Sequence, residues 1–99
     1  MTKYHLTNKA VEDLSEIWDY TYEVWSENQA DKYYVLLIDS CKEISEHPAI
    51  GKNYNEIDQG VLGVKVGTHI IFYRIIKPNE IEILRILHGR MDLKNRIKD

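Results

Sequence analysis

Residues 60–88 constrain the fold most, because they hold three apolar segments joined by two very short turns. The expected strands are residues 61–66, 69–76 and 80–87, and the dipeptides between them are Gly67-Thr68 and Pro78-Asn79. Glycine accepts the positive φ angle that a type II′ turn needs at its first central position, and proline at that position favours a type I turn. The sequence therefore predicts two consecutive hairpins, which make a three-stranded meander.

The two turns also predict which residues lie opposite each other. The expected pairs are Val66 with His69, Lys65 with Ile70, Gly63 with Phe72, Lys77 with Glu80, Arg74 with Ile83, and Phe72 with Arg85. Because side chains alternate between the two faces of a sheet, one face should be almost entirely apolar, and we expect helices to cover it. It holds Leu62, Val64, Val66, His69, Ile71, Tyr73, Ile75, Leu84, Ile86 and His88.

The opposite face, called here the outer face, combines apolar side chains with three cations. It is expected to hold Lys65, Ile70, Phe72, Arg74, Ile76, Ile81, Ile83, Arg85 and Leu87. An apolar surface of this size is unusual on a soluble monomer. We therefore expect the outer face to be open and to bind a partner.

Two amphipathic helices are expected before the meander, after a short strand at residues 3–6. The first should begin after the cap Thr7 and bury Val11, Leu14, Ile17, Trp18, Tyr22 and Trp25, which recur every three or four residues. The second should begin at Ser26, which has capping-box spacing to Gln29, and end at His47-Pro48. Its stripe is Ala30, Tyr33, Tyr34, Leu37, Cys41 and Ile44. The expected fold is α+β: an N-terminal strand, an antiparallel helical hairpin and an antiparallel meander in one sheet, with the helices on one face.

Length and composition narrow the class of protein. The 99 residues suit a single domain, and no apolar run approaches the roughly 20 residues of a membrane span. Nothing at the N-terminus resembles a signal peptide, and the one cysteine fits a reducing compartment, so we expect a cytoplasmic protein. Four scattered histidines lack zinc-type spacing, and we expect neither metal nor cofactor.

Charge is divided unevenly along the chain. Residues 1–46 contain four Lys or Arg against ten Asp or Glu, whereas residues 47–99 contain nine against six. A dedicated nucleic-acid-binding domain is usually strongly basic. Direct sequence-specific binding of nucleic acid is therefore not expected.

Several segments, in order, resemble the ParE/RelE superfamily of toxins from type II toxin-antitoxin systems, and the ParE branch in particular. They are LTNKA at 6–10, DL at 13–14, IWDY at 17–20, QA at 29–30 with Tyr33, VG at 66–67 followed by IIFYR at 70–74, and ILRILHGRMDL at 83–93. The resemblance implies a non-enzymatic, plasmid-stabilising toxin that poisons DNA gyrase. It also implies a ParD-like antitoxin that wraps the toxin with a flexible amphipathic segment, in a complex such as a heterotetramer.

Two alternatives remain open. RelE-type relatives cleave mRNA in the ribosome, and here such chemistry would fall to Lys65, Arg74, Arg85 and His88, which can bind phosphate or transfer protons. RelE-type enzymes also tend to carry a tyrosine near the C-terminus, and no tyrosine follows Tyr73. The third possibility is a non-toxic interaction module on the same fold.

The candidate binding residues fall into two groups. For the antitoxin we expect aromatic side chains of the helices and side chains of the outer face: Trp18, Tyr22, Trp25, Ile70, Phe72, Arg74, Ile76, Ile81, Ile83 and Arg85. For the target, by resemblance, we expect the basic tail, with Arg90, Met91, Lys94 and Arg96. Both groups are expectations about binding, and neither is catalytic.

Overall fold

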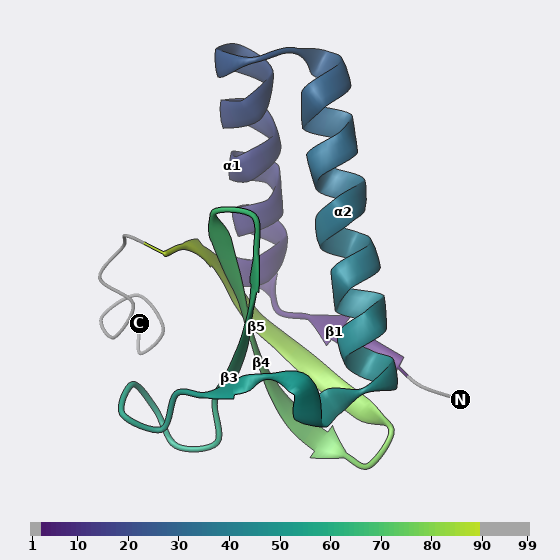
Figure 1. The fold of residues 1–99 in the computed structure, drawn as a ribbon, viewed down its shortest axis with the longest axis vertical. Coiled ribbons are helices and arrows are strands. Elements are labelled where there is room, and N and C mark those ends of the chain that lie inside the picture. Colours follow the sequence, from purple (N-terminus) through teal and green to yellow (C-terminus); the bar gives the residue numbers. More distant parts are fainter. Residues whose placement is uncertain (1–2, 90–99) are drawn as a thin grey trace.

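A computed structural model describes residues 3–89, which form one sheet and a helical hairpin (Figure 1). The elements are β1 (Lys3–Leu6), α1 (Asn8–Val24), α2 (Glu27–Glu46), a 3-10 turn η1 (Pro48–Ile50), β2 (Lys52–Asn53), β3 (Leu62–Val66), β4 (His69–Lys77) and β5 (Glu80–His88). The strand order is β1-β5-β4-β3-β2, with β1 parallel to β5 and the other neighbours antiparallel. The α+β architecture expected from the sequence is confirmed.

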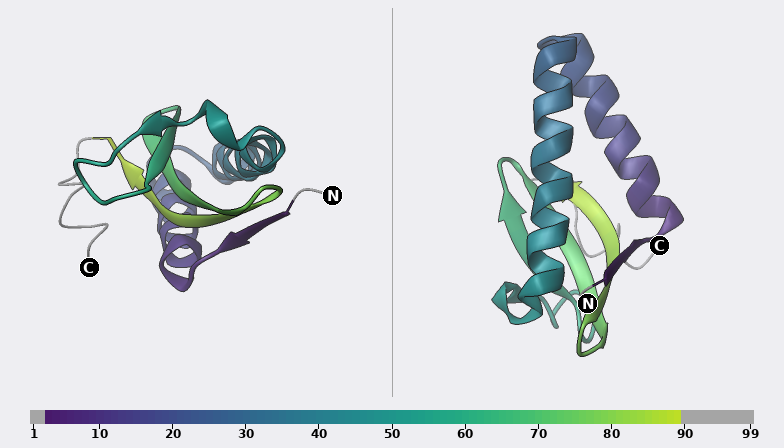
Figure 2. Two further views of the ribbon diagram at one scale, coloured as in Figure 1. Left: turned by 90° about the horizontal axis from the view of Figure 1, so that it is seen from below. Right: turned by 90° about the vertical axis from the view of Figure 1, so that its right-hand side faces the viewer.

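The helices begin and end where the sequence predicts. The hydroxyl of Thr7 accepts a hydrogen bond from the Ala10 amide at 3.1 Å, and the hydroxyl of Ser26 accepts one from the Gln29 amide at 3.0 Å. Each cap satisfies one amide that the first turn leaves without a partner. α2 ends at Glu46, directly before His47 and Pro48. The hairpin therefore has a fixed turn at its upper end and extends well past the strands (Figures 1 and 2).

α1 packs with a different side than the sequence predicted. Its buried residues are Ala10, Asp13, Leu14 and Thr21, with Ile17 half-buried beside them. Val11, Tyr22 and Trp25 of the expected stripe are exposed, Trp25 by 74%. Apolar residues lie on more than one side of α1, and the small residues Ala10 and Thr21 let the neighbouring elements approach closely. The Thr21 hydroxyl donates to the Ile17 carbonyl at 2.7 Å, so its burial leaves no polar group unpaired.

The register of the meander is correct at its ends and wrong in its middle. Val66–His69, Lys65–Ile70, Gly63–Phe72, Phe72–Arg85 and Lys77–Glu80 pair as expected. Arg74 pairs with Glu82 instead of Ile83, because the register shifts between Phe72 and Tyr73 and again between Ile75 and Lys77. Such shifts insert a residue on one strand and invert the side chains between them. Ile81 and Ile83 consequently join the core beneath the helices, and Leu84 moves to the outer face.

The outer face is covered by the chain itself, so the expectation of an open face is wrong. Ile57 and Val61, from the segment between β2 and β3, pack on Ile70, Phe72 and Leu87. The Tyr54 ring meets the Phe72 ring edge-on, with centroids 5.2 Å apart. Arg74 fastens the same segment, because it donates to the Asp58 carboxylate at 2.8 Å and to the Gln59 carbonyl at 3.2 Å. A second small core results.

Candidate functional site

A cleft of about 740 Å³ lies between the helical hairpin and the strands. The cleft is lined by α1, by the start of α2, by the β3–β4 turn and by the end of β5. We call it the hairpin cleft. Its lining residues are Asp13, Glu16, Ile17, Tyr20, Thr21, Trp25, Gln29, Tyr33, Thr68, His69, Arg85, Ile86, Leu87 and His88.

The floor of the hairpin cleft is an ion pair between Asp13 of α1 and Arg85 of β5. Arg85 Nε and Nη2 donate to the two carboxylate oxygens, each at 2.8 Å, and the Ile86 amide donates to the same carboxylate at 3.0 Å. Asp13 is 6% exposed. The hydrogen bonds that Arg85 donates to Asp13 raise the pKa of Arg85, although burial opposes the rise. This pair fixes α1 against β5.

Asp13 has a role that the sequence analysis did not give it. Its position near the start of a helix suggested a favourable interaction with the helix dipole. The structure places it on the buried side of α1, one position from Leu14, where a carboxylate needs a cation. The available signal was its spacing, because Asp13 is next to Leu14 and four positions before Ile17, both of which were expected to be buried.

The wall opposite α1 holds a cluster of Tyr33, His69 and His88. The Tyr33 hydroxyl lies 2.7 Å from His69 Nδ1 and 3.2 Å from the Val66 carbonyl. Both contacts are hydrogen bonds when Nδ1 carries the proton and donates to the tyrosine oxygen, which in turn donates to the carbonyl. The rings of His69 and His88, a cross-strand pair, have centroids 5.4 Å apart.

The pKa of His69 is lowered, first by burial and then by the neighbouring His88, while Asp13 acts in the opposite direction. His69 is therefore neutral at physiological pH. The sequence analysis gave His69 no function. The register that it derived does put His69 on the same face as His88, and this was the signal that could have found the pair.

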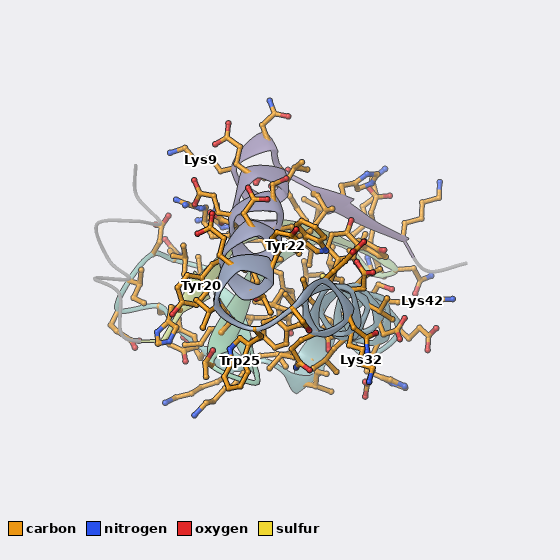
Figure 3. All side chains as sticks on the ribbon, turned by 90° about the horizontal axis from the view of Figure 1, so that it is seen from above. Lys9, Tyr20, Tyr22, Trp25, Lys32 and Lys42 are labelled. Carbon is orange, nitrogen blue, oxygen red and sulfur yellow. The ribbon has the colours of Figure 1, made fainter. Side chains whose placement is uncertain are left out.

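Exposed aromatic side chains form the rim of the hairpin cleft. Tyr20 is 67% exposed and Trp25 is 74% exposed. Figure 3 looks along the helical hairpin from its turn and shows Tyr20 and Tyr22 leaving α1 on opposite sides, with Trp25 near the turn. Of the three helix aromatic residues expected to bind a partner, only Trp25 lines the hairpin cleft.

Trp18 and Tyr22 lie on the surface of the other side of α1. Their rings stack with centroids 5.3 Å apart and an interplanar angle of 13°. The Trp18 indole donates to Asp31 of α2 at 3.0 Å, which ties the two helices together. The pair extends the aromatic surface around the hairpin without entering the hairpin cleft.

The strand residues expected to meet a partner divide by exposure. Ile70 is 9% exposed, and Phe72, Ile81 and Ile83 are fully buried, so these four offer no contact surface. Ile76 is exposed at the end of β4.

The four residues considered for RNA cleavage do not share one site. Arg85 and His88 line the hairpin cleft. Arg74, which is bonded to Asp58, lines a second hollow of about 270 Å³, and Arg85 lines this hollow as well. Lys65 is exposed on β3 and lines neither hollow. The tail residues expected to bind the target, Arg90, Met91, Lys94 and Arg96, lie outside the described residues.

Residues 3–89 contain no group of three or more His, Cys, Asp or Glu that could hold a metal ion. Burial raises the pKa of the Cys41 thiol to about 12, so this cysteine is not a reactive thiolate. Neither described helix combines the length and apolar character that crossing a membrane requires.

Comparisons with known proteins agree on one family. The sequence model described as "ParE toxin of type II toxin-antitoxin system, parDE" matches residues 4–93. Toxin ParE1 of Mycobacterium tuberculosis is 34% identical over 96 residues, covering 97% of this chain and 98% of that protein. Toxin ParE1 of Caulobacter vibrioides is 33% identical over 94 residues, covering 95% and 96%.

Solved structures share the fold. A chain of a chromosomal ParDE system from P. aeruginosa superposes with a TM-score of 0.74 at 24% identity, covering 89% of this chain and 96% of that chain. A chain of the RelBE2 toxin-antitoxin complex of M. tuberculosis gives 0.68 at 20% identity, covering 88% and 96%. With a family match over most of its length and two relatives above 30% identity, the chain belongs to the ParE toxin family of type II toxin-antitoxin systems.

Proposed function

We propose that this chain acts in the cytoplasm as the toxin of a toxin-antitoxin pair, that it inhibits DNA gyrase by binding, and that a ParD-like antitoxin neutralises it. Family membership supports the toxin assignment. The observation that carries the antitoxin proposal is the hairpin cleft, which this chain's described residues leave open while Trp25 and Tyr20 stand exposed at its rim. Open apolar clefts with aromatic rims are typical of surfaces that bind a partner.

The proposed antitoxin contact is centred on Trp25 and extends to Trp18 and Tyr22 around α1. A segment that binds there also meets Arg85 at the floor of the hairpin cleft. Arg74 and Ile76 lie away from the hairpin cleft and would be reached only by a partner that continues across the sheet. The resulting complex is a hetero-oligomer of toxin and antitoxin.

Binding, and not catalysis, is the proposed mode of inhibition. Cleavage of an RNA strand needs a cation at the scissile phosphate together with groups that transfer protons. Arg85 is engaged by Asp13, Arg74 is engaged by Asp58, and Lys65 lies outside the hairpin cleft. The expected set is therefore not gathered at one site, which favours an inhibitor over a ribonuclease.

The proposed gyrase contact lies in the basic tail, with Arg90, Met91, Lys94 and Arg96. Four of the tail's ten residues carry positive charge. A chain ending at Gly89 is expected to lose gyrase inhibition and to keep antitoxin binding. Full inhibition by the truncated chain would contradict the assignment of the tail.

The function is tested with the purified toxin in gyrase supercoiling and DNA-cleavage assays, beside an assay for ribosome-dependent mRNA cleavage. The expected result is loss of supercoiling with accumulation of cleaved DNA, which the antitoxin reverses, and intact mRNA. Cut transcripts without an effect on gyrase would assign the ribonuclease activity instead. No effect in either assay, with antitoxin binding retained, would indicate a non-toxic interaction module.

A further inference from the structure

The lining of the hairpin cleft has an excess of negative charge on the side of α1. Among the described lining residues, the carboxylates are Asp13 and Glu16, and the one permanent cation is Arg85. Arg85 is engaged by Asp13 through two bonds of 2.8 Å. Within residues 3–89, no hydrogen bond or ion pair engages the carboxylate of Glu16, which is an exposed residue. A negative charge thus faces the cleft.

One aromatic face lies close to this charge on α1, and a second stands further along the rim. Tyr20 follows Glu16 by four positions, so the two side chains occupy neighbouring places on one side of α1. Both Tyr20 and Trp25 are more than half exposed at the rim. An exposed aromatic face attracts a cation by about 0.5–1 kcal/mol, and more when water is excluded. Glu16 beside Tyr20 is the environment in which a planar guanidinium can stack and form paired hydrogen bonds. Trp25 lies nine positions from Glu16, roughly 13 Å along the helix, so it can contact only a neighbouring residue of the same ligand.

The rest of the hairpin cleft and its surroundings fit the same ligand. Ile17, Ile86 and Leu87 provide an apolar lining that suits aliphatic side chains next to a cation. α1 also carries Glu12, Asp19 and Glu23 at exposed positions, which attract a basic segment from a distance.

We propose that the hairpin cleft recognises an arginine, flanked by apolar residues, in the segment of the protein partner that it binds. Glu16 and Tyr20 contact the guanidinium, and Trp25 contacts a flanking apolar residue. This inference rests on the proposed function, in which that partner is the antitoxin. The apolar neighbours of the arginine fill the lining, and the guanidinium lies against the rim. The hairpin cleft therefore selects a basic amphipathic segment over an acidic one.

The test uses the full-length toxin and two blocked tripeptides, one with arginine between two leucines and one with citrulline, its neutral isostere, at that position. Binding is followed by NMR through the indole signal of Trp25 and the ring signals of Tyr20. The arginine peptide is expected to shift these signals, and the citrulline peptide to bind about fivefold more weakly. Glu16→Gln should remove this preference, since an exposed charge pair contributes up to about fivefold in affinity. Glu43→Gln, the same change at an exposed position of α2 outside the hairpin cleft, should keep it.

Equal binding of the two peptides, or equal effects of Glu16→Gln and Glu43→Gln, would overturn the proposal. A chain that ends at Gly89 could bind the arginine peptide many times more tightly than the full-length toxin does. That result would show that the chain's own basic end competes for the hairpin cleft, and it would also overturn the proposal. Titration with the cognate antitoxin distinguishes failure of the arginine proposal from failure of the proposed toxin function. If the antitoxin binds both variants equally, the arginine proposal fails and the toxin function stands. If the antitoxin does not bind even the unmutated toxin, the proposed function fails, while the tripeptides still report on the cleft.

Discussion

Asp13 and Arg85 are separated by 72 positions in the chain, yet two hydrogen bonds of 2.8 Å join their side chains at the floor of the hairpin cleft. The Asp13 carboxylate also accepts the Ile86 amide at 3.0 Å. One acidic residue of α1 thus satisfies a guanidinium and a backbone group of β5. The two elements that form the walls of the hairpin cleft are held together by this carboxylate.

Asp13→Asn is expected to lower the free energy of unfolding by on the order of 3 kcal/mol, because removing one partner of a buried ion pair leaves the other charge uncompensated. Urea denaturation followed by circular dichroism measures the change. Asp19→Asn, at an exposed position of the same helix, is the matched control and should change stability little. A loss as small as that of the control would show that the pair contributes nothing to the fold.

The stability of the protein should decrease as the pH falls below about 6.5. The pKa of His69 is lowered in the folded state from its ordinary value of 6.5, so the unfolded chain binds a proton first. The stabilisation linked to neutral His69 is fully present above pH 6.5 and is lost progressively as the pH falls through the lowered pKa. Tyr33 and His88 lie against the ring, and the charge of Asp13 acts on it; Arg85 lines the same cleft. All four residues are unchanged in the variant tested. Unfolding midpoints between about pH 7.5 and 5 should depend less on pH in His69→Gln; an unchanged pH dependence would assign the effect to other groups.

Gly63→Ala should destabilise the protein by about 1–3 kcal/mol, the usual result of overpacking. A Cβ atom at Gly63 would lie 2.7 Å from a ring carbon of Tyr54, so the covering segment would have to move. In the Tyr54→Ala background the same substitution should cost much less, and a double-mutant cycle measures the coupling. Gly89→Ala, where the nearest atom is 3.8 Å away, is the control. Additive effects of the Gly63 and Tyr54 substitutions would contradict the proposed contact between them.

Trp25→Ala should weaken antitoxin binding by tenfold or more and leave stability almost unchanged. The side chain is 74% exposed, so little is lost within the toxin itself, whereas aromatic residues at the centre of an interface often contribute about 2 kcal/mol or more. Isothermal titration calorimetry measures the affinity, and thermal unfolding checks the fold. Tyr34→Ala, an exposed aromatic of α2 outside the hairpin cleft, should have a small effect. Equal losses from the two substitutions would place the antitoxin elsewhere.

The sequence could predict the parts of this fold that local chemistry decides. Thr7 and Ser26 begin the helices because their hydroxyls reach the first-turn amides. Gly67, with a φ angle of 58°, sets the pairing of β3 with β4 through a turn too short to allow another register. At these positions the residue type permits few alternatives.

The two register shifts between β4 and β5 could not be predicted in the same way. The run from Ile81 to Leu87 is apolar at most positions, so inverting Ile81 and Ile83 puts apolar side chains on either face. The covering of the outer face is equally non-local. Ile57 is an isolated apolar residue in a polar segment, and its burial with Val61 against Phe72 depends on how that segment folds over the sheet.

The candidate site depends on local residue type and also on contacts between distant parts of the chain. Trp25 was identified as a binding residue from its aromatic character, but its exposure depends on how α1 rotates against the sheet. Asp13 and Glu16 gained their roles only when β5 was placed beside α1. Pairing from distant parts of the chain decides which charges are satisfied and which remain available to a ligand.

The carboxylate of Asp13 also limits how a partner can attach. β5 continues to His88, five residues past Ile83, the last residue that pairs with β1. Along this free border of the sheet, the Thr7 hydroxyl already donates to the Leu84 carbonyl at 2.7 Å, and the Ile86 amide already donates to Asp13. An incoming strand would have to displace both side chains before it could pair with β5. A helix or an irregular segment that docks through its side chains faces no such barrier.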